Sequence, residues 1–181
     1  LGNHILENAF SLFFASCYFK NEKFYKISEK LIFKELNEQI LDDGAHFELS
    51  PMYHQIILYR ILDCLNLSIL NNYKCKILEN LLREKASLML TWLNNITFNN
   101  GSIPMVNDSS HDIAPLTKQL NEYAQRLELK LTNINLSKSG YRMYKTADAE
   151  LFIDVGEVKS NYQPGHTHSD IFNFILYYKN N

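Results

Sequence analysis

Hydrophobic residues recur at helical spacing through the first half of the chain. From Asn3 to about Thr97, apolar positions mostly lie three or four residues apart, as in amphipathic helices. This pattern predicts helices over residues 3–19, 22–40, 51–67 and 74–96. A fifth is predicted over 116–127, after a loop rich in Asn, Ser, Gly and Pro. Ser50 followed by Pro51 fits an N-cap and a first helical residue.

The pattern changes after Lys130. The stretches GYRMYKT, AELFIDVG and DIFNFILYY are rich in aromatic and β-branched residues, alternate in part, and are bounded by turn signals. Helices followed by strands predict an α+β protein with two domains. We expect an all-α domain over residues 1–130, in which short connections suit stacked antiparallel hairpins, and the start of an antiparallel β domain over 131–181.

Composition narrows the possible functions. The formal net charge is -2 and no block of Lys and Arg stands out, which argues against a nucleic-acid partner. The longest apolar run, residues 9–19, is too short to span a bilayer. The chain begins in helical periodicity without a methionine and stops after a strand-like run, so we expect it to be part of a longer protein.

The stretch QPGHTHSD concentrates residues that can bind metal or move protons. If it is extended, the two-residue period of a strand places His166, His168 and Asp170 on one face. Imidazole is a common zinc ligand and a nearby carboxylate can orient it. Taken alone, the same residues fit a solvated turn.

Two further stretches carry candidate chemistry. In HFELSPMYH, Tyr53 and His54 fall in the first turn of a predicted helix, where backbone N–H groups favour a phenolate or a bound carboxylate. Tyr53 also fits a half-buried aromatic residue. In GNHILENA, Asn3 and His4 lie at a helix start, where Asn is a common cap, and the loop VNDSS fits a turn followed by a helix cap.

Together, the stretches NHILENAFSLFFASCYF, LNEQILDDGAHFELSPMYHQIILYRILDCLNL, VNDSS and SGYRMYKTADAELFIDVGEVKSNYQPGHTHSDIFNFIL resemble, in order and spacing, the heparinase II/III-like polysaccharide lyases. The resemblance covers nearly the whole chain, and GAHFELSPMYH and QPGHTHSD are its most specific parts. It implies an incomplete (α/α) toroid of helical hairpins followed by the first strands of an antiparallel β-sandwich, with the active site between them. It also implies β-elimination on an acidic, uronate-containing polysaccharide, and we expect a periplasmic location.

The resemblance also implies roles for individual residues. Asn3 and His4 match the pair that neutralises the substrate carboxylate, and Tyr53 matches the catalytic base and acid. His166 matches the partner base. His168 matches a ligand of a structural zinc ion whose other ligands we expect beyond residue 181.

Some roles stay open. His46 and Glu48 lie close in sequence to the implied cleft, so they either support Tyr53, contact sugar or stabilise the loop. His54 either contacts substrate or packs within its helix. A non-catalytic glycan-binding or surface-polysaccharide assembly protein of the same fold is the alternative function, while a metal-dependent hydrolase is disfavoured because no site for a metal-activated water is evident.

Overall fold

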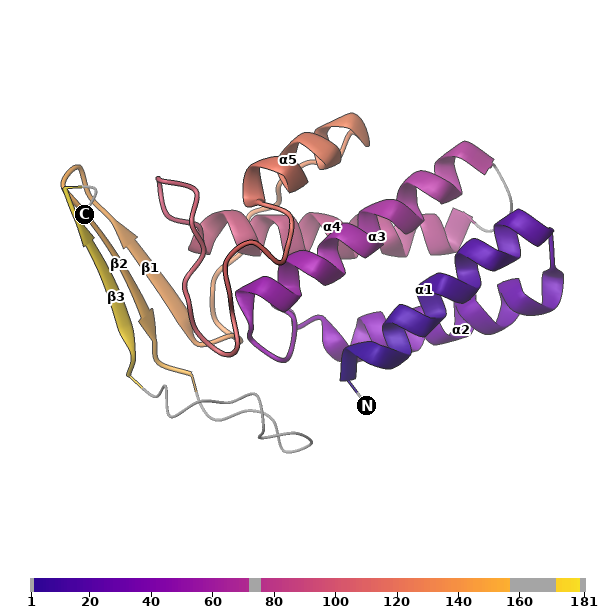
Figure 1. Cartoon of the computed structure of the whole chain (residues 1–181), viewed down its shortest axis with the longest axis horizontal. Coiled ribbons are helices and arrows are strands. Elements are labelled where there is room, and N and C mark those ends of the chain that lie inside the picture. Colours follow the sequence, from indigo (N-terminus) through magenta and orange to yellow (C-terminus); the bar gives the residue numbers. More distant parts are fainter. Residues whose placement is uncertain (1, 72–75, 157–171, 180–181) are drawn as a thin grey trace.

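The computed structural model describes residues 2–71, 76–156 and 172–179, with side chains described from His4 onward. In these ranges the chain forms five helices and one three-stranded sheet. Figure 1 shows the helices as one layered body, with the sheet standing at one of its ends. The predicted order of helices followed by strands is therefore confirmed.

Four long helices make two antiparallel hairpins. They are α1 (Gly2–Phe19), α2 (Glu22–Gln39), α3 (Pro51–Asn71) and α4 (Lys76–Ile96). α1 pairs with α2 and α3 pairs with α4, while α1 also packs on α3. Figure 1 shows α1 and α3 running in the same direction, with their N-terminal ends toward the side on which the sheet stands. α3 continues beyond its predicted end at residue 67.

A short fifth helix crosses the second hairpin. α5 (Thr117–Arg126) packs against α3 and α4. The long loop before it runs from the end of α4 past the start of α3, as Figure 1 shows. This path brings residues near 107–110 to the first turn of α3.

The hydrophobic core lies between the helices because each helix buries its apolar stripe against a neighbour. Residues on these stripes are almost fully buried: Leu6, Phe10, Phe13, Ile32, Leu36, Ile57, Leu58, Ile61, Leu82, Met89 and Leu93. None of the described helices combines the length and hydrophobicity needed to cross a membrane.

The sheet is antiparallel with strand order β1-β2-β3. Its strands are β1 (Tyr141–Lys145), β2 (Ala149–Asp154) and β3 (Phe174–Tyr178), and Tyr141 pairs with Asp154 across the first ladder. Burial alternates along β2, so that Glu150, Phe152 and Asp154 face inward. This two-residue alternation is typical of a strand with one face covered.

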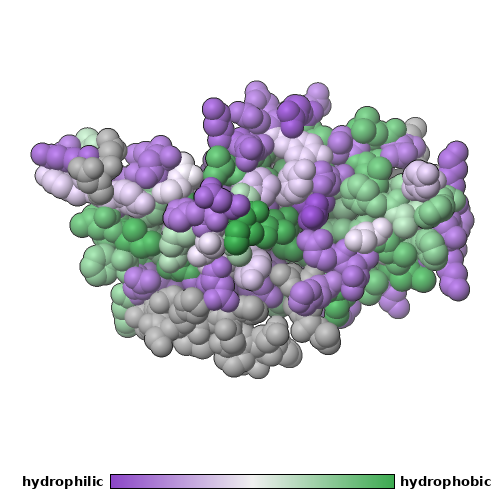
Figure 2. All heavy atoms as spheres, viewed as in Figure 1, coloured by the Kyte–Doolittle hydropathy of each residue, from purple (hydrophilic) through white to green (hydrophobic). Residues whose placement is uncertain are grey.

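Many of the exposed hydrophobic side chains lie at two ends of the molecule. Figure 2 shows them over the strands and over the opposite, helical end. Those on the strands are Tyr144, Phe174, Leu176 and Tyr178, and those at the helical end include Tyr18, Phe19, Leu70 and Ile77. An apolar outer face is what one layer of a β-sandwich presents to the other.

A buried junction, formed by Asp43, Trp92, Ser139, Gly140 and Tyr141, joins the sheet to the helices. The Ser139 N–H and hydroxyl both donate to Oδ2 of Asp43, at 2.7 and 2.8 Å. Trp92 Nε1 donates to the Ser139 hydroxyl at 3.2 Å, and the rings of Trp92 and Tyr141 lie 5.8 Å apart. These contacts fix the start of β1 on the loop after α2 and on α4.

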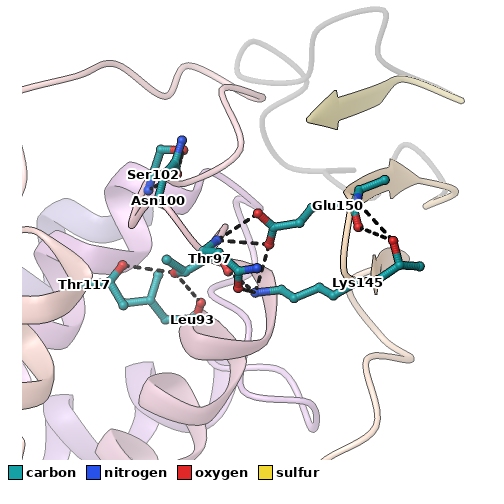
Figure 3. Close-up of polar contacts among 10 residues, drawn as sticks. Leu93, Thr97, Asn100, Ser102, Thr117, Lys145 and Glu150 are labelled. Carbon is teal, nitrogen blue, oxygen red and sulfur yellow. Dashed lines mark hydrogen bonds and ion pairs between the residues drawn. The ribbon is translucent and has the colours of Figure 1, made fainter. Parts of the chain in front are cut away.

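A second contact, the hairpin junction, is formed by Thr97, Asn99, Lys145 and Glu150. Figure 3 shows Lys145 and Glu150 reaching from the β1–β2 hairpin to the end of α4. The Asn99 N–H lies 2.9 and 3.0 Å from the two carboxylate oxygens of Glu150. Lys145 Nζ donates to the Thr97 carbonyl at 2.6 Å and pairs with Glu150 at 3.4 Å. The hairpin is therefore attached to the helical layer at both of its ends.

Candidate active site

The first turn of α3 holds Tyr53 at the end of the helical layer that faces the sheet. The Ser50 hydroxyl accepts the Tyr53 N–H at 3.4 Å, and the Ser50 carbonyl accepts the His54 N–H at 2.9 Å. Ser50 is therefore the N-cap that the Ser-Pro pair predicts. Tyr53 is half-buried, with its ring packed against the core.

A second serine caps the same helix from the loop before α5. The Ser109 hydroxyl accepts the Met52 N–H at 3.2 Å and lies 3.2 Å from the Ser50 hydroxyl. The stretch VNDSS, interpreted as a turn followed by a helix cap, does supply a cap through Ser109, but the capped helix is the earlier α3, and α5 begins only at Thr117. A sequence 57 residues away thus completes the first turn of α3.

The two serine caps determine which backbone N–H groups at the start of α3 remain free to bind a ligand. Pro51 has no N–H, and the N–H groups of Met52 and Tyr53 are already bonded to serine hydroxyls. The Met52 and Tyr53 N–H groups are therefore not free to bind an anion near Tyr53, and side-chain donors would have to do so. The helix dipole still favours negative charge at this position.

Three groups, which we call the Leu49 clamp, hold the turn just before α3. The Tyr141 hydroxyl donates to the Leu49 carbonyl at 2.5 Å. The Asn107 amide donates to the same carbonyl at 3.3 Å and to the Tyr141 hydroxyl at 2.9 Å. The helical part, the loop before α5 and the sheet therefore meet at one carbonyl group.

His54 is part of the core beside the buried junction. Its side chain is fully buried, and its ring lies 4.5 Å from that of Trp92. Nδ1 accepts the His46 N–H at 3.2 Å, so Nε2 carries the proton that it donates to the Met89 carbonyl at 2.9 Å. Burial lowers the pKa of His54 to about 4, although the Met89 carbonyl and the Asp43 charge oppose the shift.

His46 is buried in the same way. Its Nε2 lies 3.2 Å from the Gln39 amide oxygen, and burial, with a smaller effect of His54, lowers the pKa of His46 to about 3. For both histidines, the placement favours the packing roles that the sequence left open over contact with sugar. Glu48 is only half-buried, and its contact with substrate stays a prediction.

His4 is exposed in the first turn of α1. α1 and α3 meet through an ion pair between Glu7 and Arg60, whose Oε2 and Nε atoms are 3.5 Å apart. His4 lies about one turn before Glu7, and Tyr53 lies about two turns before Arg60, on the same helix faces. The two residues thus belong to the same end of the α1–α3 interface. The Asn3 side chain lies outside the described part of the chain.

The remaining predicted residues lie outside the described ranges. His166, His168 and Asp170 fall in residues 157–171, so their predicted roles stay predictions. Within the described residues, His, Cys, Asp and Glu side chains form no group of three that could hold a metal ion. The described part of the chain therefore does not supply a zinc site by itself.

The sequence assigns no role in the site to three residues that shape it, although VNDSS is interpreted as a turn and helix cap. Ser109, Asn107 and Tyr141 come from distant segments, and each contacts the turn before α3 or the first turn itself. The loop gives one local signal, since Asn107 adopts a positive φ of 49° that Asn tolerates better than most residues. Nothing near Tyr141 in the sequence indicates its partner.

Comparison with known proteins finds relatives of both parts of the chain. A family model described as "Heparinase II/III N-terminus" matches residues 1–129, and one described as "Heparinase II/III-like, C-terminal" matches residues 131–181. A heparin-sulfate lyase from Bacteroides stercoris is 26% identical over 112 residues, which are 60% of this chain and 17% of that protein.

Solved structures share the fold over the whole chain. A heparinase III superposes with a TM-score of 0.75 at 19% identity, covering 99% of this chain and 31% of its own. The heparan sulfate lyase HepC from Pedobacter heparinus gives a TM-score of 0.70 at 20% identity, covering 100% of this chain and 32% of its own. These likenesses confirm the predicted class of a helical toroid followed by an antiparallel β-sandwich. The chain spans about a third of the length of each solved relative.

Proposed function

Because this chain belongs to the heparinase II/III family, we propose that it forms part of a polysaccharide lyase that cleaves a uronate-containing glycan by β-elimination. Support comes from the two family matches and from the relative named as a heparin-sulfate lyase. The observation that carries the proposal is the position of Tyr53. It lies in a first helical turn that two serines cap, at the end of the helical layer facing the sheet.

The reaction removes the proton beside the uronate carboxylate. The electron pair of that C–H bond forms a ring double bond, the glycosidic C–O bond breaks, and the departing oxygen takes up a proton. Tyr53 is the group we assign to accept the first proton and to return one to the leaving oxygen. A phenol holds its proton tightly, so this role relies on the positive end of the α3 dipole, which favours negative charge at this position.

Negative charge that develops next to the carboxylate must be neutralised. The serine caps already use the first-turn N–H groups of α3, so we assign this task to the side chains of Asn3 and His4. An amide N–H and an imidazolium can both bond carboxylate oxygens. His166 is the partner base in this proposal, for substrates whose proton lies on the other face of the ring.

The test measures reaction type and the role of Tyr53 together. Full-length protein mixed with a panel of uronate polysaccharides should release products with new ultraviolet absorbance, because the double bond is conjugated to the carboxylate. Tyr53→Phe should lower kcat at least roughly 100-fold with substrate binding nearly unchanged. Tyr59→Phe, a half-buried tyrosine farther along α3, should stay within about twofold and is the matched control.

Several results would contradict this assignment. Reducing sugar without the absorbance would indicate a hydrolase, and binding without any product would indicate the non-catalytic glycan-binding alternative. Near-normal turnover in Tyr53→Phe would transfer the base role to His166.

Zinc and location are separate parts of the proposal. We infer a structural zinc ion that uses His168 with ligands outside this sequence, and no step above passes through it. His168→Ala in the full-length protein should lower the zinc content measured by elemental analysis, because one ligand is lost. A periplasmic location would be checked by fractionating the producing cells.

A further inference from the structure

Tyr141 belongs to the sheet, but its hydroxyl acts on the helical part of the chain. The residue is fully buried, and its ring lies 5.8 Å from that of Trp92 and 4.9 Å from that of Phe152. The ring packing fixes where the hydroxyl points. Its target, the Leu49 carbonyl, lies 92 residues earlier in the sequence.

The turn that Tyr141 contacts has an unfavourable backbone conformation. Leu49 has a φ of 56°, a left-handed value that costs free energy for a residue with a branched side chain. The Leu49 N–H donates to the His46 carbonyl at 2.9 Å, and the Leu49 carbonyl accepts from Tyr141 and Asn107. Contacts from outside α3 thus hold the turn in this conformation.

The same turn sets the start of α3. The Leu49 carbonyl belongs to the peptide unit that ends at Ser50 N, and Ser50 is the N-cap that bonds the Tyr53 N–H. Any rotation of that peptide unit moves the cap, and with it the first turn. Ser109 accepts the Met52 N–H from the loop that also carries Asn107. The Ser109 cap and the Leu49 clamp, which both hold the first turn of α3, therefore use the same loop.

We propose that Tyr141 is a positioning residue for Tyr53, through the Leu49 clamp and the Ser50 cap. The inference rests on the proposed function, in which Tyr53 transfers protons. A misplacement of about 1 Å at a reacting group can lower a rate about 100-fold, so a hydroxyl that fixes the turn has a measurable effect on turnover. The sheet would then contribute to the reaction through a residue that never touches substrate.

The first experiment removes only the hydroxyl. In the full-length protein, Tyr141→Phe keeps the packed ring, so we expect kcat to fall about 10- to 100-fold while KM changes less than about twofold. Tyr123→Phe is the control, because its hydroxyl is also bonded, to Asp63 at 2.9 Å, but lies in the groove between α3 and α5. The control should keep its kcat.

A second variant removes the other hydrogen-bond donor of the Leu49 clamp. Asn107→Gly deletes the amide that bonds Leu49 and Tyr141, and glycine accepts the positive φ of this position. Its kcat should fall in the same range. The double variant should lose no more than about the larger single loss, because both changes break one clamp.

Hydrogen exchange tests the clamp without relying on activity. Loosening the turn should speed exchange of the Met52 and Tyr53 amides, whose acceptors are Ser109 and Ser50, in Tyr141→Phe but not in Tyr123→Phe. If the unaltered protein releases no unsaturated product, the proposed function fails. The hydrogen-exchange rates of Met52 and Tyr53 then still show whether Tyr141 holds the first turn of α3. A lowered melting temperature with unchanged kcat and unchanged exchange would show that Tyr141 is merely structural and would overturn the proposal.

Discussion

The buried junction and the hairpin junction attach the same sheet to the same helices by different physical means. In the buried junction, Asp43 is 2% exposed and Ser139 is fully buried, so their hydrogen bonds are shielded from water. In the hairpin junction the Lys145 side chain is 35% exposed, and water can replace the partners that it loses. Hydrogen bonds in a low dielectric are stronger, and their loss costs more.

The two junctions also lead to different places. The buried junction continues through Tyr141 and the Leu49 carbonyl to the turn before Tyr53. The hairpin junction ends at the last turn of α4 and the loop after it, where Lys145 bonds the Thr97 carbonyl. We therefore expect changes at the buried junction to affect both stability and the candidate site, and changes at the hairpin junction to affect mainly the attachment of the hairpin.

Glycine substitution should give the largest difference between the junctions. A Cβ on Gly140 would lie 2.2 Å from the Gly156 Cα, and its φ is 78°. Gly101, in the loop beside the hairpin junction, has a similar φ of 86° but no atom within 4 Å of such a Cβ. Gly140→Ala should therefore destabilise the protein by at least about 3 kcal/mol, and Gly101→Ala by about 1 kcal/mol.

Chemical unfolding of both variants measures this difference, and Gly101→Ala is the control for backbone strain alone. Equal losses in the two variants would mean that the close approach of Gly140 and Gly156 contributes nothing.

Amide substitution of the two carboxylates should give a smaller difference. Asp43 accepts from the Ala45 N–H on one oxygen and from Ser139 on the other. In Asp43→Asn, the side-chain NH2 group would replace one of these oxygens and would then face an N–H or O–H donor. Glu150→Gln keeps one oxygen for the Asn99 N–H and loses mainly the attraction of Lys145. We expect losses of about 2 to 3 kcal/mol for Asp43→Asn and about 1 kcal/mol or less for Glu150→Gln, from denaturant midpoints. The reverse order would contradict the assignment of the buried junction as the stronger one.

Local sequence signals explain why the helices could be predicted. Asn21 accepts the Lys23 and Phe24 N–H groups at the start of α2, and Ser50 caps α3, so both boundaries have a cause within a few residues. The contacts that build the candidate site have no such cause. Ser139 meets Asp43 across 96 residues, and no spacing or propensity indicates that pairing.

The lack of local signals for long-range contacts also explains why the sequence left two roles open for His54, substrate contact or packing within its helix. Its position after Tyr53 in the first turn of α3 gives both residues the same local setting. The burial of His54 depends on Trp92 and Met89, which belong to another helix. Only tertiary packing separates a half-buried tyrosine from a fully buried histidine at adjacent positions.

Mild acid should give the smallest effect on stability, and it should act at the buried junction, beside which His46 and His54 lie. The pKa values of His46 and His54 are lowered to about 3 and about 4, against about 6.5 in an unfolded chain. As the pH falls through about 6.5 the unfolded chain binds protons that the folded histidines do not, so this stability is full well above pH 6.5 and falls progressively as the pH drops toward the folded pKa values. Between about pH 8 and pH 6, each histidine should remove about 0.8 kcal/mol of unfolding free energy.

His54→Gln, which keeps an amide donor for the Met89 carbonyl, should reduce this pH dependence by one histidine's share in denaturant titrations at the two pH values. An unchanged pH dependence in that variant would mean that His54 accepts its proton without unfolding, and that the buried junction opens more easily than its contacts indicate.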